Sequence, residues 1–405
     1  MSKDTRTTPT DGLSVIAIIP ARGGSKGIPR KNIVTVAGKP LISYIIGSAQ
    51  QSRYISEVIV STDDVEIASV AREYGAEVVM RPKELSGDDS PSELALLHAI
   101  DELEKCQGKH PDIIVFLQCT CPLTSTGDID NTISRLMEEN ADTSFTGTPS
   151  HYFLWTVNDK GEAVTVNHDK AFRKRRQDCE PQYIETGSVY ALRCEGFLAH
   201  KSRFFGKTVL SVIPPTRILD IDDPDDIPRA EEALRKQNQV RMLECLPQKT
   251  EAVIFDFDGV FTDNRVIVHE DGGEAVLCNR GDGLGISLLK KTGCQILVLS
   301  KEKNPVVQKR TEKLGIPCVY GIDNKKAYLL TWLKERDIDP GNVIFLGNDI
   351  TDIECIEFVG CGAAVADANE RVKNASRLIL DNNGGHGAVR ELCDMVISRQ
   401  IDLNK

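Results

Sequence analysis

Short apolar segments alternate with amphipathic segments in two separate stretches of this chain, and this alternation constrains the fold more than any other feature. The first stretch begins near Ser14 and the second at Ala252. Such alternation is typical of α/β domains in which helices cover both faces of a mainly parallel sheet. We therefore predict an α/β protein with two Rossmann-like, doubly wound domains. In the first stretch the pattern predicts strands at 15–20, 58–61, 77–80 and 113–118, and helices at 41–51, 65–74 and 92–105.

The domain boundaries follow from where the two patterns start and stop. A chain of 405 residues is long enough for two or more domains. We expect a disordered tail over 1–13, a first domain over 14–235, a linker over 236–250 and a second domain over 251–400. Within the first domain, residues 143–217 are less regular. In the second domain the pattern predicts strands at 252–255, 295–300, 317–320, 343–347 and 362–365.

Composition excludes several classes of partner. The net charge of −11 gives no basic footprint, so we expect neither nucleic acid nor a membrane surface as a partner. No apolar run approaches the roughly 20 residues that span a bilayer. The first 13 residues are polar, and no signal peptide is expected from them. The twelve cysteines are scattered, which suits reduced thiols in the cytoplasm.

A glycine-rich, basic run follows the first predicted strand and indicates an anion site. The glycines of Arg22-Gly23-Gly24-Ser25-Lys26-Gly27 let backbone N–H groups approach an anion closely. Arg22, Lys26 and Lys31 add three cations within ten residues, which suits a triphosphate. The run lacks the signatures of a P-loop and of a dinucleotide fingerprint. The alternative is a solvated basic loop.

Two carboxylates near the end of the first stretch indicate a metal site. Asp220 and Asp222 are one residue apart, so they share one face if the chain is extended there. Such a pair can hold Mg²⁺. Two more polar blocks, 81–85 and 117–123, follow predicted strands. Ligands of α/β proteins bind at that end of the sheet.

In this order the blocks closely resemble the CMP-sialic acid synthetases, the acylneuraminate cytidylyltransferases, which have a nucleotide-diphospho-sugar transferase type of fold. The resemblance runs from about Val15 to Leu234. It implies that CTP and a nine-carbon 2-keto sugar acid, a sialic acid, give the CMP-sugar and pyrophosphate. The anomeric hydroxyl of the sugar would attack the α-phosphorus of CTP.

The resemblance also implies roles for individual residues. Asp220 and Asp222 would bind Mg²⁺, and Asp222 would act as a catalytic residue that helps to activate the nucleophile. The segment 152–176 resembles the family's dimerisation arm, which implies a homodimer through the first domain. Gln118 and Arg176 would contact the sugar acid. The implied nucleotide-binding residues are Arg22, Lys26, Lys31, Asn32, Arg81 and Ser92.

Two departures from the family pattern lie near the expected sugar site. Thr186 stands where many bacterial relatives have Asn, and Thr124 stands where many have Arg. The sequence therefore constrains the identity of the sugar less than that of the nucleotide, and the candidate sugars are Neu5Ac, KDN and legionaminate-type acids. The related KDO cytidylyltransferases are the alternative family. Their first loop lacks the Ser-Lys-Gly-x-Pro-x-Lys-Asn run that this chain has from Ser25 to Asn32.

The second stretch carries a different phosphate motif. Asp256 and Asp258 follow its first predicted strand, and this pattern favours a haloacid dehalogenase (HAD)-type phosphatase. Such a phosphatase also needs a Ser or Thr after a later strand, a Lys at a helix start and an acidic block after another strand. Ser300, Lys325 and the block 347–352 meet these needs in order. A capped turn alone would not explain this series.

The chemistry needs this set of residues. Asp256 would attack phosphorus to form an aspartyl-phosphate, and Asp258 would act as general acid and then as general base. Ser300 and Lys325 would hold the phosphoryl oxygens. Mg²⁺ would be held by Asp256, by the backbone carbonyl of Asp258 and by the acidic block. In that block Asn348 replaces the usual aspartate, and Asp349 is a possible substitute.

The gaps between these motifs indicate a phosphatase without a cap. About 40 residues separate Asp258 from Ser300 and 25 separate Ser300 from Lys325, whereas a cap domain needs ~50 or more. This HAD-like pattern resembles the capless, tetrameric phosphatases of KDO 8-phosphate and KDN 9-phosphate. The resemblance implies a tetramer through the second domain. It also implies sugar contacts for Glu302, Arg310 and Lys313.

Together the two patterns predict a bifunctional enzyme that uses Mg²⁺ in both domains. The second domain would remove the phosphate of a sialic acid 9-phosphate, and the first would couple the free sialic acid to CMP from CTP. The alternative is a cytidylyltransferase whose HAD-like domain is an inactive tetramerisation platform. Asp256 favours the bifunctional hypothesis, because an assembly module has no need of a nucleophile.

Overall fold

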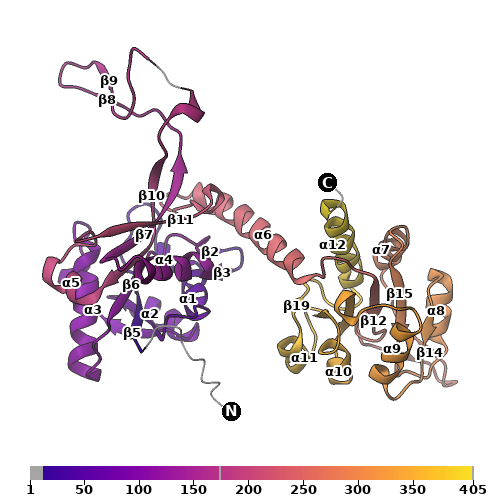
Figure 1. The fold of residues 1–405 in the computed structure, drawn as a ribbon. Helices are drawn as coiled ribbons and strands as arrows, with labels where there is room; N and C mark the ends of the chain where they lie inside the picture. Colours follow the sequence, from indigo (N-terminus) through magenta and orange to yellow (C-terminus); the bar gives the residue numbers. More distant parts are fainter. Residues whose placement is uncertain (1–11, 173–174, 404–405) are drawn as a thin grey trace. The chain divides into compact units, whose positions relative to one another are not determined.

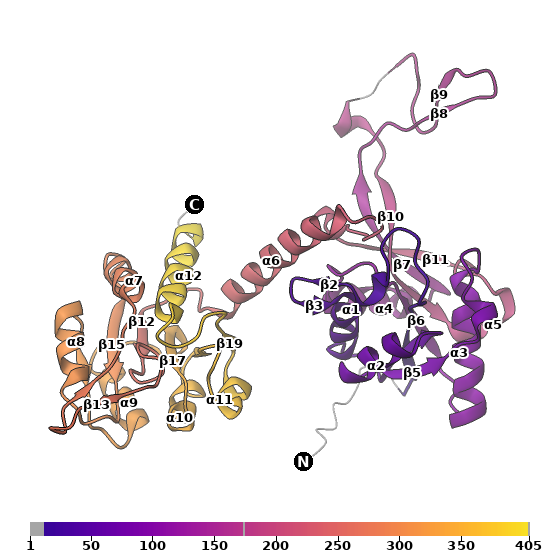
Figure 2. The ribbon, with the colours of Figure 1, turned by 180° about the vertical axis from the view of Figure 1, so that it is seen from behind.

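The computed structural model describes residues 12–172 and 175–403, and its contacts divide the chain into two compact units between Gln237 and Asn238. Figures 1 and 2 show the elements of each unit from opposite sides. The tail predicted over 1–13 lies almost wholly outside the described residues.

A seven-stranded mixed sheet forms the centre of the first unit, in the order β11-β7-β10-β6-β1-β4-β5. The strands predicted as parallel pair in parallel. The sequence did not predict the edge formed by residues 143–212, in which β10 runs antiparallel to both its neighbours. The strands are β1 Val15–Pro20, β4 Glu57–Thr62, β5 Glu77–Met80, β6 Ile113–Leu117, β7 Thr143–Ser150, β10 Gln182–Arg193 and β11 Thr208–Val212.

Helices cover both faces of this sheet. In β1, Val15, Ala17 and Ile19 belong to one buried cluster, whereas Ile16 and Ile18 belong to another. Strand side chains alternate between faces, so each face has its own core. This confirms the doubly wound arrangement. One face packs against α1 Leu41–Gln50, α2 Val65–Glu73 and α4 Thr126–Glu138, and the other against α3 Ser92–Gln107 and α5 Cys194–His200.

An arm projects from the end of this sheet where β7 and β10 continue past their neighbours (Figure 1). It carries a small hairpin, β8 Trp155–Val157 with β9 Ala163–Thr165, and the short helix η3 Arg176–Asp178. Several large apolar side chains of the arm are exposed, among them Tyr152 at 72% and Phe172 at 68%. Exposed apolar groups gathered on one segment are typical of interaction surfaces.

The helix α6 Asp226–Cys245 contains the division between the units. Residues 236–245 of the expected linker are therefore helical, and only 246–251 lie between α6 and the next strand.

A six-stranded parallel sheet forms the centre of the second unit, in the order β16-β15-β12-β17-β18-β19. Its strands are β12 Ala252–Phe255, β15 Gln295–Leu299, β16 Cys318–Val319, β17 Val343–Gly347, β18 Cys361–Ala364 and β19 Leu378–Ile379. Its helices are α7 Arg280–Lys290, α8 Val306–Leu314, α9 Lys325–Lys334, α10 Ile353–Ile356, α11 Glu370–Ala375 and α12 Ala388–Leu403.

The second unit has no cap domain among its described residues. The stretch between β12 and α7 holds only a short hairpin, β13 Ile267–Val268 with β14 Glu274–Ala275. The stretch between β15 and α9 holds only α8 and β16. The capless arrangement predicted from the motif spacing is therefore present.

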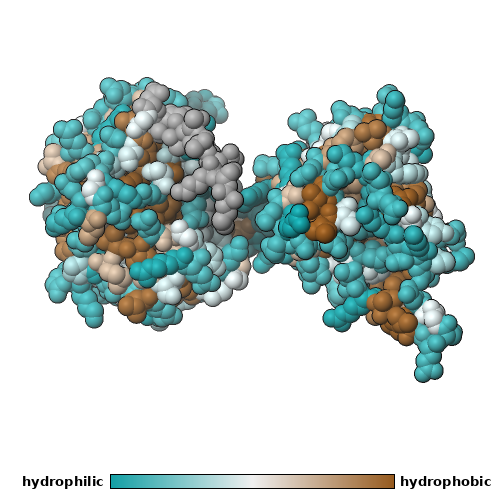
Figure 3. Space-filling view, turned by 90° about the horizontal axis from the view of Figure 1, so that it is seen from below, coloured by the Kyte–Doolittle hydropathy of each residue, from teal (hydrophilic) through white to brown (hydrophobic). Residues whose placement is uncertain are grey.

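The surface mixes polar and apolar residues. On the face drawn in Figure 3, hydrophobic residues are scattered among hydrophilic ones. Within 12–172 and 175–403, no helix has the length and apolar character needed to cross a membrane.

Candidate active sites

The glycine-rich loop after β1 is held against the end of β4. The backbone N–H of Gly23 donates to Asp63 Oδ1 at 3.0 Å, and Asn32 Nδ2 donates to the carbonyl of Arg22 at 2.9 Å. A Cβ on Gly23 would lie 2.7 Å from Asp64 Oδ2, so a side chain at this position would collide with Asp64. The Asp63-Asp64 pair follows β4 directly, a position from which it could have been anticipated.

Two of the expected phosphate-binding cations share one carboxylate. Arg22 Nη1 lies 2.7 Å from Asp88 Oδ1, and Lys26 Nζ lies 3.0 Å from Asp88 Oδ2. The hydrogen bond from Lys26 is the largest cause that lowers the pKa of Asp88, and Arg22 adds to it. All three side chains are partly or largely exposed. The cations therefore stand where an anion can reach them.

The third cation meets the predicted metal carboxylates. Lys31 Nζ lies 2.9 Å from Asp222 Oδ1. Gly27 also approaches this segment, because a Cβ there would lie only 2.3 Å from the carbonyl oxygen of Asp222. Burial is the main cause that raises the pKa of Asp220; Asp222 adds to it, whereas a hydrogen bond from Thr120 opposes it. The fold thus brings together the predicted nucleotide and metal residues.

This carboxylate pair fits a magnesium ion. The described residues contain no group of three or more His, Cys, Asp or Glu side chains placed to hold a metal. Mg²⁺ typically takes one or two carboxylates and completes its shell with water and substrate phosphates. Asp220 and Asp222, beside the cationic loop, match that donor set.

Arg81 and Ser92 lie at either end of one loop. Arg81 is buried, its Nε donates to Ser86 Oγ at 3.0 Å, and burial is the largest cause that lowers its pKa. Ser92 begins α3, and its Oγ accepts from Arg203 Nη2 at 2.6 Å. The guanidinium of Arg203 also lies over the ring of Phe116. No sequence motif pointed to Arg203, because it lies 111 positions from Ser92.

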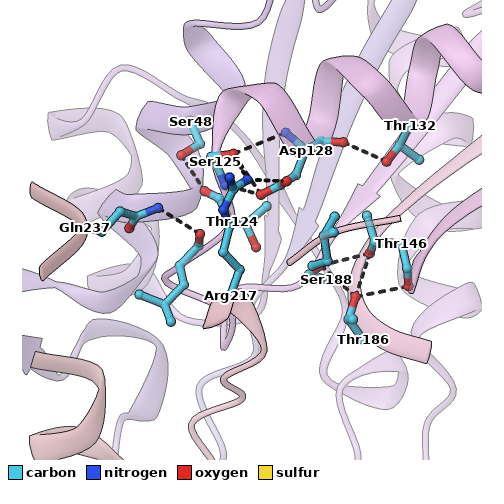
Figure 4. Close-up of polar contacts among 12 residues, drawn as sticks. Ser48, Thr124, Ser125, Asp128, Thr132, Thr146, Thr186, Ser188, Arg217 and Gln237 are labelled. Carbon is cyan, nitrogen blue, oxygen red and sulfur yellow. Dashed lines mark hydrogen bonds and ion pairs between the residues drawn. The ribbon is translucent and has the colours of Figure 1, made fainter. Parts of the chain in front are cut away.

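Gln118, which is predicted to contact the sugar acid, lies against a bulge in β10. Gly187 has φ +74°, and a Cβ there would lie 3.2 Å from Gln118 Oε1. Hydroxyl groups of Thr146, Thr186 and Ser188 hydrogen-bond to one another beneath this bulge (Figure 4). Thr186, one of the two departures from the family pattern, is thus part of the network that shapes the bulge.

Thr124, the other departure from the family pattern, and Arg176 in the arm have no described contact with Gln118. Thr124 is buried, and its hydroxyl donates to the carbonyl of Cys121 at 2.9 Å. Arg176 begins η3 in the arm, and its side chain lies outside what the structure describes. Its sugar contact stays a prediction.

In the second unit, Asp256 and Asp352 lie on either side of Lys325. Lys325 Nζ is 2.7 Å from Asp256 Oδ1 and 2.7 Å from Asp352 Oδ1. Asp256 also accepts from the N–H of Phe257 at 2.7 Å. Burial, with Asp352 adding to it and Lys325 opposing it, raises the pKa of Asp256 to about 7. Asp352 was not among the predicted site residues, although it belongs to the acidic block.

Asn348 fits a metal ligand better than Asp349 does. Asn348 is buried, and its Oδ1 has no hydrogen-bond partner. It is pressed against the nucleophile loop, since a Cβ on Gly259 would lie 1.9 Å from Asn348 Nδ2. An orphaned buried amide oxygen calls for an explanation, and Mg²⁺ accepts such a donor. Asp349 is exposed, and its carboxylate caps η6 Ile350–Asp352.

Asp258 stands near the predicted sugar residue Glu302. Burial is the largest cause that raises the pKa of Asp258, and Glu302 is the next. A raised pKa suits a carboxyl that protonates a leaving group. Ser300 is buried directly after β15, and its Oγ accepts from the N–H of Glu302 at 3.0 Å.

The remaining predicted sugar residues lie on α8. Arg310 Nη2 donates to the carbonyl of Asn279 at 3.1 Å, whereas its buried Nε has no partner. Lys313 is exposed, three positions further along the helix. The glycine-rich segment 384–387 packs on the nucleophile loop of its own unit, because Gly385 N donates to Val260 O at 2.9 Å.

Comparisons with known proteins agree with this division of chemistry. Residues 16–245 match the cytidylyltransferase family model, and residues 320–392 match the model of a haloacid dehalogenase-like hydrolase. The chain is 32% identical over 390 residues to N-acylneuraminate cytidylyltransferase A of Danio rerio, a match that covers 95% of this chain and 88% of the relative.

Two further matches each cover part of the chain. Pseudaminic acid cytidylyltransferase of Campylobacter jejuni is 33% identical over 216 residues, covering 52% of this chain and 92% of the relative. The solved 3-deoxy-D-manno-octulosonate 8-phosphate phosphatase of Moraxella catarrhalis is 26% identical, with a TM-score of 0.39, and covers 40% of this chain and 94% of the other.

The chain therefore belongs to the cytidylyltransferase family. Within it, the full-length match groups the chain with the N-acylneuraminate cytidylyltransferases, and its second unit carries a HAD-like hydrolase domain. The family resemblance predicted from the sequence is confirmed.

Proposed function

We propose that the first unit transfers CMP from CTP to a sialic acid, releasing pyrophosphate. The observation that carries this proposal is the meeting of the basic loop with the carboxylate pair, through Lys31 and Asp222 and through Gly27. The full-length match to an N-acylneuraminate cytidylyltransferase supports the same reaction.

The residues divide this reaction between them. Arg22, Lys26 and Lys31 offset the charge of the triphosphate, which transfer at the α-phosphorus requires. Asp220 and Asp222 would hold Mg²⁺, which supplies Lewis-acid polarisation of the phosphate when it is bound. Gln118 orients the sugar acid from the end of β6 so that its anomeric hydroxyl faces the nucleotide.

We further propose that the second unit is an active phosphatase for sialic acid 9-phosphate. Asp256 attacks phosphorus, the P–O bond to the sugar breaks, and Asp258 gives its proton to the leaving alcohol. Asp258 then takes a proton from the water that releases inorganic phosphate and restores Asp256. Asp256, the Asp258 carbonyl and Asn348 would hold Mg²⁺, which offsets phosphate charge. The buried nucleophile and its buried lysine support this proposal over an inactive platform.

Two readouts on one protein test both proposals. With CTP, Mg²⁺ and a free sialic acid, we expect pyrophosphate and the CMP-sugar; with Mg²⁺ and sialic acid 9-phosphate but no CTP, we expect inorganic phosphate. Asp222→Asn should remove only the first activity and Asp256→Asn only the second. Wild-type protein that releases no phosphate would refute the phosphatase and leave the transferase standing.

Sugar identity, assembly and location stay part of the proposal. CTP-dependent turnover should be compared among Neu5Ac, KDN, a legionaminate-type acid and pseudaminic acid, the last because a relative of the first unit is named for it. We propose a dimer through the arm and a tetramer through the second unit. A cytoplasmic location suits the twelve cysteines, all of which are free.

A further inference from the structure

The proposed metal carboxylates stand on a segment without regular secondary structure. Asp220 and Asp222 lie between η4 Pro215–Arg217 and α6. The downstream part of the segment is fixed by the chain itself. Ile221 is fully buried and its N–H donates to the carbonyl of Thr120 at 3.0 Å, and Asp222 N donates to Asp226 Oδ2 at 3.1 Å. Asp220 itself accepts a hydrogen bond from Thr120, so the part that needs another anchor is the stretch before it, residues 217–219.

Arg217 supplies that anchor. Its Nη1 donates to Ser125 Oγ at 2.8 Å and to Asp128 Oδ1 at 2.5 Å. Figure 4 shows the side chain reaching from the segment to the beginning of α4. Asp128 is only 3% exposed, so its charge needs a partner, and Arg217 is the cation that the structure places beside it.

Ser125 and Asp128, the acceptors of the Arg217 hydrogen bonds, are themselves held by neighbouring residues. Ser125 and Asp128 form a capping box, with the Asp128 N–H on Ser125 Oγ and the Ser125 N–H on Asp128 Oδ2. Ser48 Oγ of α1 donates to Thr124 O at 2.8 Å, and Gln237 Nε2 of α6 donates to Leu123 O at 3.2 Å. Ser125 and Asp128 are therefore fixed in place, and they would not move with Arg217 if its side chain rotated.

The start of α4, where Arg217 is bound, is connected directly to the proposed sugar site. The loop 117–123 leads from β6 to this helix start and carries Gln118 and Thr120. Arg217 thus ties the carboxylate segment to the loop that faces the sugar. An extended chain advances roughly 3.3 Å per residue, so Asp220 lies within about 10 Å of Arg217 along the chain, close enough for a displacement of Arg217 to reach it. Displacements of ~1 Å can cost about a hundredfold in rate.

We propose that Arg217 is a positioning residue that, through buried Asp128, fixes Asp220 and Asp222 at the distance a divalent cation needs. The inference rests on the proposed transfer of CMP. Arg217 itself needs no contact with substrate or metal. Its loss weakens metal binding first, and nucleotide binding only secondarily.

The experiment compares Arg217→Met, Arg217→Lys and a control, Arg53→Met. Arg53 Nε lies 3.6 Å from Oδ2 of Asp130, which is on α4 like Asp128. Among the described residues, Asp130 makes no contact that anchors the carboxylate segment. For each variant we would measure the Mg²⁺ concentration for half-maximal CMP transfer. Independently, the CTP-dependent part of Mn²⁺ binding, which leaves out the metal site proposed in the second unit, would be followed by water-proton relaxation without sugar acid, so that no turnover is needed.

For Arg217→Met we expect both midpoints to rise about tenfold, as for other residues that orient metal ligands. Arg217→Lys should recover part of the shift, because it still neutralises Asp128, and Arg53→Met should show none. Folded Arg217→Met with unchanged midpoints overturns the inference. If that variant does not fold, Arg217→Lys is the test, and unchanged metal midpoints in Arg217→Lys would likewise overturn the inference. Wild type that binds Mn²⁺ but makes no CMP-sugar refutes the proposed function instead.

Discussion

The two proposed phosphate sites of this chain hold their charged side chains in opposite environments. In the first unit Arg22 and Lys26 pair with Asp88 at the surface. In the second, Lys325 and Asp352 are almost wholly buried together with Asp256. Exposed pairs contribute little to stability and exchange partners easily, whereas breaking a buried pair leaves an uncompensated charge. The first site is therefore built to exchange one anion for another, and the second to keep its charges in place.

The largest effect is expected at Lys325. Lys325→Met leaves Asp256 and Asp352 buried without their cation, which should cost about 3–5 kcal/mol of unfolding free energy. Phosphate release should fall about a thousandfold or more, as for other residues that act as a unit with the nucleophile. Denaturant unfolding and phosphate assays check this. Lys334→Met, an exposed lysine of the same helix, is the control. Equal stability of the two variants would contradict the buried-charge argument.

The next effect is expected at Gly27 in the first site. A Cβ there would lie 2.3 Å from the carbonyl oxygen of Asp222, so Gly27→Ala must push the loop away from the carboxylates. We expect CMP transfer to fall about a hundredfold while phosphate release is unchanged. Gly47→Ala in α1, where a Cβ meets nothing within 4 Å, is the matched control. Full CMP transfer by Gly27→Ala would show that this contact can relax.

A smaller effect separates Asn348 from Asp349. Asn348→Ala removes the orphaned buried oxygen beside the nucleophile loop, so the half-activating Mg²⁺ concentration for phosphate release should rise about tenfold. Asp349→Ala removes only the cap of η6 and should leave that concentration unchanged. Magnesium titrations of the two variants make the comparison. The reverse result would assign the metal to Asp349.

Local features of the fold could be predicted from the sequence, whereas contacts between distant residues could not. Strands such as Val15–Pro20 and Val343–Gly347 were predictable, because uninterrupted apolar runs followed by polar loops mark buried parallel strands. The motif residues follow those strands and were predictable with them. Asp352, Arg203 and Arg217 were not, because their roles depend on partners 27, 111 and 89 positions away. The antiparallel β10 was missed because its bulge interrupts the alternation.

The smallest effect is expected at Asp88 and bears most directly on the comparison between the sites. Its carboxylate pairs with the two cations that we propose for CTP, so the nucleotide would have to displace it. Asp88→Asn should therefore lower KM for CTP about threefold with kcat unchanged, since exposed pairs are weak. The difference should fade as salt screens the pair. Steady-state kinetics at two salt concentrations measure it. A raised KM would mean that Asp88 holds Arg22 and Lys26 in place for the nucleotide, and the first site would then resemble the second in keeping its charges fixed.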